Sequence, residues 1–86
     1  MAGAFAAFKK RAYLLIEVDP GSESNIMHEL SKMKTVVQAD LVHGAYDIIC
    51  ILKGKYDSID ESVVTIRKIA HIRKTTTLTV FDTHLK

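Results

Sequence analysis

The chain is 86 residues long, which is enough for one small domain. Its 12 Lys and Arg residues are nearly balanced by 10 Asp and Glu residues. This balance argues against a dedicated nucleic-acid binder, which usually carries a strongly basic surface. Hydrophobic residues make up 48% of the sequence, a content typical of a folded globular domain. Because domains of this size are only marginally stable alone, oligomerisation is a common source of further stability.

Residues 1–11 form an apolar segment that ends in three charged residues. A signal peptide has the opposite order, with positive charge first and a longer apolar region after it. We interpret residues 1–11 as an N-terminal extension, and a short amphipathic helix that uses Phe5 and Phe8 is the alternative. No apolar run approaches the roughly 20 residues that a membrane-spanning helix needs, so we expect no membrane association.

The single cysteine, Cys50, lies within the apolar run of residues 48–52. One thiol cannot form an internal disulfide, which favours a reducing compartment and hence a cytoplasmic location. A catalytic cysteine would need a nearby base and some exposure. The apolar surroundings instead indicate a thiol that is packed in the core.

The first strand is predicted over residues 12–19 and ends at the turn sequence Asp19-Pro20-Gly21. A helix then begins at Ser22 or Ser24, because serine is a favourable N-cap residue. The spacing of its apolar residues places them on one helical face. These residues are Ile26, Met27, Leu30 and Met33.

The next two strands, residues 35–43 and residues 45 or 46 to 53, fold back on each other at Gly44. A two-residue loop, Gly44-Ala45, would suit a type II′ turn, which takes glycine at its first central position. Any symmetric loop of even length pairs residue 41 with 48, 39 with 50 and 37 with 52. Val37, Ala39, Leu41, Ile48, Cys50 and Leu52 then share one apolar face of the sheet.

A second helix is predicted to start at the capping box Ser58-Ile59-Asp60-Glu61 and to end near residues 70–71. Its apolar face carries Ile59, Val63, Ile66 and either Ile69 or Ala70. The last strand is predicted over residues 72–81, and residues 82–86 form a tail. Along that strand Ile72, Leu78 and Val80 share one phase, and Thr75, Thr77, Thr79 and Phe81 share the other.

The element order predicts an α+β domain over residues 12–81 with the ferredoxin-like βαββαβ arrangement. Right-handed crossovers place both helices on one face of a four-stranded antiparallel sheet with strand order 4-1-3-2. The uncovered face is then too apolar for a soluble monomer, so we predict a homodimer that forms sheet against sheet. The alternative is that residues 1–11 fold over this face. By phase the face holds Tyr13, Leu15, Val36, Val42, Ile49, Ile51 and Phe81, with Gln38, Asp40, Asp47 and the threonines.

Residues 12–81 resemble the effector-binding (RAM) domain of the Lrp/AsnC transcription regulators in its stand-alone form. The resemblance rests on AYLLIEVDPG at residues 12–21, GAYDII at 44–49 and KTTTLTVF at 74–81. It implies face-to-face dimers that often assemble into octamers or related rings. Full-length members also carry an N-terminal helix-turn-helix, and eleven residues cannot hold one. Direct DNA binding is therefore not expected, although full-length Lrp-type regulators remain candidate partners.

The resemblance also implies that an amino acid or a similar small effector binds between dimers near the Gly-x-Tyr-Asp turn. Gly44, Tyr46 and Asp47 match this turn, and the polar stretch Thr75, Thr76 and Thr77 matches the part of the last strand that lies near it. The family more often has a small or hydroxyl residue before the glycine, where this chain has His43. Because His43 lies beside Tyr46 and Asp47, it is a further candidate effector contact.

The residues alone leave two interpretations of Asp47. Its carboxylate could bind an ammonium group, or it could accept backbone N–H bonds within its own turn. Two further functions also remain open. One is an assembly module that modulates full-length Lrp-type regulators without binding a ligand, and the other is a small dimeric α+β-barrel enzyme. The four histidines lack metal-ligand spacing and no catalytic triad or phosphate loop is present. We therefore expect no metal, no cofactor and no enzymatic activity.

Overall fold

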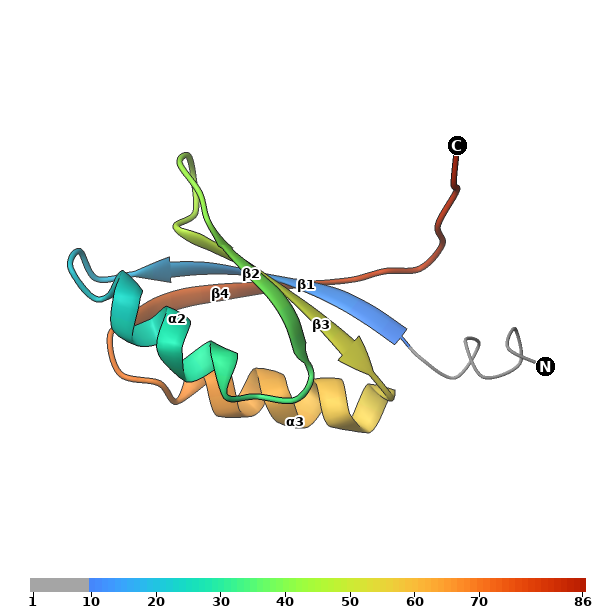
Figure 1. Ribbon diagram of the computed structural model, residues 1–86, viewed down its shortest axis with the longest axis horizontal. Coiled ribbons are helices and arrows are strands. Elements are labelled where there is room, and N and C mark those ends of the chain that lie inside the picture. Colours follow the sequence, from blue (N-terminus) through green and yellow to red (C-terminus); the bar gives the residue numbers. More distant parts are fainter. Residues whose placement is uncertain (1–9) are drawn as a thin grey trace.

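A computed structural model of the protein describes residues 10–86, which form one sheet with two helices on one of its faces (Figure 1). The chain runs through β1 (Lys10–Val18), α2 (Glu23–Ser31), β2 (Val36–Leu41), β3 (Ile48–Gly54), α3 (Tyr56–Arg67) and β4 (Ile72–Thr79). The strands lie in the order β2-β3-β1-β4, and every neighbouring pair is antiparallel. This is the predicted ferredoxin-like arrangement. The interpretations of Phe5 and Phe8 concern residues outside the described part of the chain.

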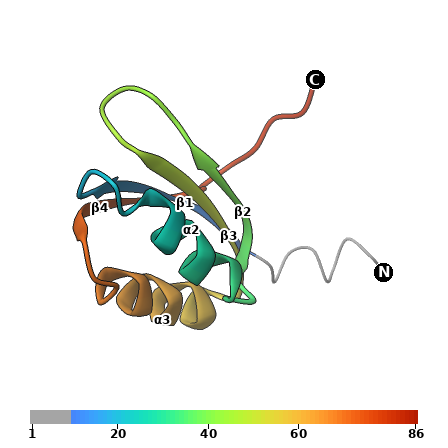
Figure 2. The same cartoon turned by 60° about the vertical axis from the view of Figure 1, so that its left-hand side comes forward.

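The core forms between the helices and the covered face of the sheet (Figure 2). Alternate residues of β1 and β3 are buried because successive side chains of a strand point to opposite faces. Both predicted helical stripes are confirmed, since their central residues are buried and their flanking residues pack against the core. The buried apolar residues are Ala12, Leu14, Ile16, Val18, Ile26, Leu30, Ile48, Cys50, Leu52, Ile59 and Ile66.

The loop between β2 and β3 is longer than the predicted two-residue turn. Val42 N–H donates to the Asp47 carbonyl at 2.9 Å, which leaves residues 43–46 as a four-residue loop. The predicted pairs Leu41–Ile48 and Ala39–Cys50 are confirmed, because an even-length loop preserves them. Gly44 adopts a φ of 135°, a conformation that glycine adopts without steric cost.

A β-bulge between Val36 and Gln38 overturns the third predicted pair. Val36, instead of Val37, lies opposite Leu52. Val36 therefore packs against the core, and the side chain of Val37 is 53% exposed. The two residues exchange the faces that strict alternation assigns to them, because the bulge inserts one extra residue into β2.

A second irregularity, between Glu17 and Val18 of β1, reverses the predicted phase of most of β4. Val18 lies opposite Ile72, but Glu17 lies opposite Lys74, so Arg73 is the extra residue. Leu14 lies opposite Thr77 and Tyr13 lies opposite Leu78. Thr75, Thr77 and Thr79 therefore lie on the covered face of the sheet. Thr76 and Leu78 lie on its uncovered face. Phe81 lies beyond the strand and is fully exposed.

The ends of α3 also differ from the prediction. The helix begins at Tyr56 with Lys55 at the N-cap position, and no side chain caps it. The expected capping box is therefore wrong, because Ser58 lies inside the helix, where its carbonyl accepts a bond from the Ser62 hydroxyl. The helix ends at Arg67, and the chain then turns through His71, whose φ is 73°.

Candidate functional site

Asp47 joins three segments of the backbone at the start of β3. Its N–H donates to the Ile16 carbonyl and its carbonyl accepts from Val42 N–H, both at 2.9 Å. Its carboxylate Oδ2 accepts from Val18 N–H, also at 2.9 Å. The carboxylate thus bonds to the last residue of β1 and not to its own turn. Because an ionised carboxylate can accept several hydrogen bonds, this contact leaves acceptor capacity for a ligand.

A hollow with a volume of about 330 Å³ lies beside this carboxylate. This Asp47 hollow is lined by Glu23, Leu41, Val42, His43 and Asp47. It combines two carboxylates with two aliphatic side chains and an imidazole. Glu23 Oε1 accepts the Gly21 N–H at 2.9 Å, so both carboxylates are held in place by a backbone bond. Such a surface attracts a ligand that has an ammonium group and an apolar part.

The remaining predicted site residues fall into separate places. Gly44 is exposed within the loop. The Tyr46 hydroxyl lies 3.2 Å from Thr76 Oγ1, which links the loop to β4 across the uncovered face. Thr75 and Thr77 lie on the other side of β4, opposite Ile16 and Leu14. The structure therefore brings His43 together with Asp47, and Tyr46 together with Thr76.

Glu23 lines the Asp47 hollow but was not among the candidate residues that the sequence indicated. It appears in the sequence as an acidic residue in the first turn of a helix, a common stabilising feature. The predicted topology already implied that Glu23 and Asp47 lie near each other, because the end of β1 and the start of β3 must meet at one end of the sheet. Glu23 lies five residues after the end of β1, and Asp47 lies directly before the start of β3.

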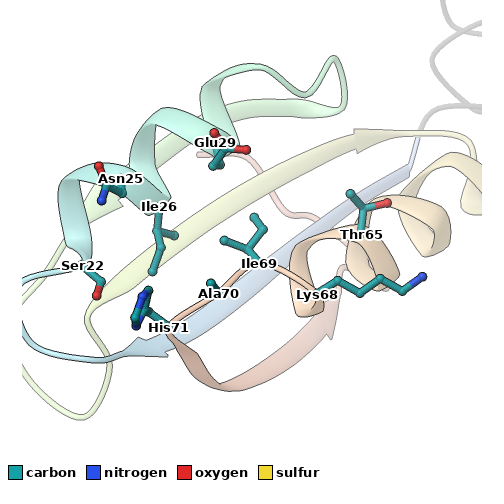
Figure 3. Close-up of a pocket in the computed structure, with 9 residues that line it drawn as sticks. All are labelled: Ser22, Asn25, Ile26, Glu29, Thr65, Lys68, Ile69, Ala70 and His71. Carbon is teal, nitrogen blue, oxygen red and sulfur yellow. The ribbon is translucent and has the colours of Figure 1, made fainter.

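A larger hollow, about 440 Å³ in volume, lies between α2 and the segment that joins α3 to β4 (Figure 3). Ile26 and Ile69 contribute apolar surface to it, and Ser22 and Asn25 contribute polar groups. The charged groups at its margin do not converge on it, because Glu29 pairs with Lys32 at 3.0 Å and Lys68 extends along α3 away from His71 (Figure 3). The Asp47 hollow is therefore the better match for a charged small molecule.

Residues 10–86 contain neither a cluster of metal ligands nor a helix that could cross a membrane. Within that range no three His, Cys, Asp or Glu residues are placed to hold a metal ion together. None of the helices in the same range has the length and apolar character needed to cross a membrane.

Burial raises the pKa of the Cys50 thiol to about 11, so at neutral pH this group is a protonated core thiol.

Comparisons with known proteins agree with this architecture. Residues 11–86 match the family described as the Lrp/AsnC ligand binding domain. Among solved structures, FFRP-DM1 is 28% identical with a TM-score of 0.79, and the match covers 84% of this chain and 99% of that one. A search of curated proteins gave no significant match.

Two longer chains share the fold at lower identity. Escherichia coli AsnC is 17% identical with a TM-score of 0.87, and the match covers all of this chain and 60% of AsnC. The feast or famine regulatory protein of M. tuberculosis was solved in complex with L-methionine. It is 16% identical with a TM-score of 0.78, and the match covers all of this chain and 59% of that protein. The family match over residues 11–86 decides the assignment: this chain belongs to the Lrp/AsnC ligand-binding domain family, and its role is that of a regulatory domain.

Proposed function

We propose that this domain senses a free amino acid, or a similar small zwitterion, at the Asp47 hollow. The observation that carries the proposal is that Glu23 and Asp47 line one hollow, beside a loop in which His43, Gly44 and Ala45 are exposed. The carboxylates would bind the ammonium group through charge-assisted hydrogen bonds. Backbone N–H groups of the loop would bind the carboxylate group, and Leu41 and Val42 would contact the side chain of the effector.

The position of the hollow favours a site that a second subunit completes. Leu41, at its margin, is 58% exposed, and His43 is also exposed. A neighbouring copy could cover these side chains and the bound effector together, so that binding would change the stability of the assembly. The M. tuberculosis relative was solved with L-methionine, which makes this amino acid the first ligand to test.

Replacement of Asp47 by Asn distinguishes the contribution of the negative charge to ligand binding from that of the hydrogen bond to Val18. The Asn amide oxygen can still accept the Val18 N–H, whereas the negative charge is lost. We expect Asp47→Asn to keep its melting temperature within a few degrees and to bind the amino acid about tenfold more weakly or worse. A thermal-shift screen of L-methionine and the other standard amino acids selects the ligand, and isothermal titration calorimetry measures its affinity.

Asp60→Asn is the matched control, because Asp60 is an exposed carboxylate on α3 that lies outside the hollow. It should bind like the natural protein. Equal affinities for Asp47→Asn and the natural protein would remove Asp47 from the site. If none of the standard amino acids binds, amino-acid sensing is excluded. Co-purification with a full-length Lrp-type regulator would then support the alternative function as an assembly module.

A further inference from the structure

The near-neutral composition conceals a concentrated positive region. Residues 62–81 contain Arg67, Lys68, Arg73 and Lys74 and no Asp or Glu. Because the whole chain has a formal net charge of +2, the four cations leave the rest of the chain with a charge of 2 − 4 = −2. Without the four cations at the end of α3, in the segment after it and in β4, the chain would have a net negative charge.

The fold brings three of these cations to one hollow. α3 ends at Arg67 and β4 starts at Ile72, and the positive φ of His71 helps to reverse the chain between them. A hollow with a volume of about 280 Å³ results, lined by Arg67, Ile72, Arg73, Lys74 and Thr75. Apart from Ile72, every side chain in this lining can donate a hydrogen bond. We call it the basic hollow.

The hollow also lies at an open edge of the sheet, since β4 is an outer strand. Val80 N–H donates to the Arg11 carbonyl, and the pairing from Thr79 to Lys74 continues in the same register. Alternation along an antiparallel ladder then turns the backbone N–H of Thr75 toward the open edge. Arg73 is the extra residue of the bulge, an irregularity that commonly re-aims a side chain.

Acidic side chains compensate these cations only in part. Asp19 Oδ1 lies 3.8 Å from Arg73 Nε, but the other oxygen of this carboxylate contacts His71 Nδ1 at 3.3 Å. Glu17 lies opposite Lys74 in the strand register. Within residues 10–86, neither Arg67 nor Lys74 has a carboxylate within ion-pair distance. The helix dipole favours Arg67 at the end of α3, but it does not explain the cations at the start of β4.

We propose that the basic hollow binds a phosphoryl anion, with the diphosphate group of a small molecule as its preferred ligand. The planar guanidinium groups of Arg67 and Arg73 suit bidentate contacts to phosphate oxygens. Lys74 adds charge, and Thr75 adds a hydroxyl and a backbone N–H. The site is separate from the Asp47 hollow and does not depend on amino-acid binding.

The test titrates inorganic pyrophosphate, inorganic phosphate and a short DNA duplex into the ¹⁵N-labelled protein, with amide shifts followed by NMR. Pyrophosphate should shift the amides of residues 67–75 and bind more tightly than phosphate. Arg67→Gln and Arg73→Gln should each weaken binding about tenfold. Asp19→Asn should strengthen it, because the change removes the competing carboxylate. Added salt should weaken binding, since the cations are exposed.

Lys34→Gln is the matched control, an exposed cation outside the hollow, and it should bind like the natural protein. Tighter binding of the duplex with the same dependence on the two arginines would support the anion site but overturn the preference for a small-molecule diphosphate, because nucleic-acid phosphate would then be the source of the anion. The proposal is overturned if none of the three probes shifts residues 67–75. Equal losses in Lys34→Gln and in the arginine variants would also overturn it, because they would indicate attraction to overall charge alone.

Discussion

At the scale of single residues, Asp47 both stabilises the backbone and lines the candidate site. Its carboxylate bonds to the last backbone N–H of β1 and also lines the Asp47 hollow. Neither of the two interpretations that the sequence allows includes this bond, because it joins residues that are 29 positions apart. Any ligand that competes for the carboxylate would act on the end of β1, and through Asp19 on the segment that contains His71.

The buried thiol of Cys50 predicts how the stability of the protein depends on pH. Burial raises its pKa from 9.0 to about 11, so between these pH values the unfolded chain releases a proton that the folded chain retains. Deprotonation then favours the unfolded state, and stability should fall as the pH rises from 9 to 11, by up to about 3 kcal/mol. The Cys50→Ala variant has no thiol to titrate. The difference in the free energy of unfolding between the natural protein and Cys50→Ala, measured by urea denaturation, should therefore become smaller as the pH rises from 9 to 11. A constant difference between the two proteins would contradict the assignment.

At the scale of elements, hydrophobic periodicity predicted the six elements and their order, because each buried face repeats at the period of its helix or strand. The stripe through Ile26 and Leu30 and the alternation along β1 are the clearest cases. Periodicity could not predict the bulges at Val36/Gln38 and Glu17/Val18, since a bulge depends on the partner strand and not on the local pattern. Local patterns also do not show which side chains from distant segments line one hollow, so the sequence indicated Asp47 and His43 but not Glu23.

The bulge in β2 can be tested with two neighbouring valines. Val36 packs against the core and Val37 is 53% exposed. Val36→Ala should therefore lower the free energy of unfolding by about 1–2 kcal/mol, while Val37→Ala should change it by less than about 0.5 kcal/mol. Urea denaturation of the two variants measures the difference. Under strict alternation the two costs would be reversed, and that outcome would place the register shift elsewhere in the strand.

At the scale of the whole molecule, the helices leave one face of the sheet uncovered (Figures 1 and 2). Cross-strand pairs join its apolar side chains into one patch: Leu15 lies opposite Ile49, and Tyr13 lies opposite both Ile51 and Leu78. The four residues of β1 and β3 are half-buried by their neighbours, and Leu78 is 50% exposed. A patch of this kind, on a chain of 86 residues, is typical of an interface.

We therefore expect the natural protein to form a sheet-to-sheet homodimer, with larger rings built from such dimers. A charge at the centre of the patch would be buried without a partner on association, at a cost of several kcal/mol. Ile51→Lys should consequently give the mass of a monomer by light scattering at micromolar concentration. Val64→Lys is the matched control, because it adds the same charge at a residue of α3 that is 51% exposed, and it should remain a dimer. A monomeric natural protein, or a dimeric Ile51→Lys variant, would exclude this face as the interface.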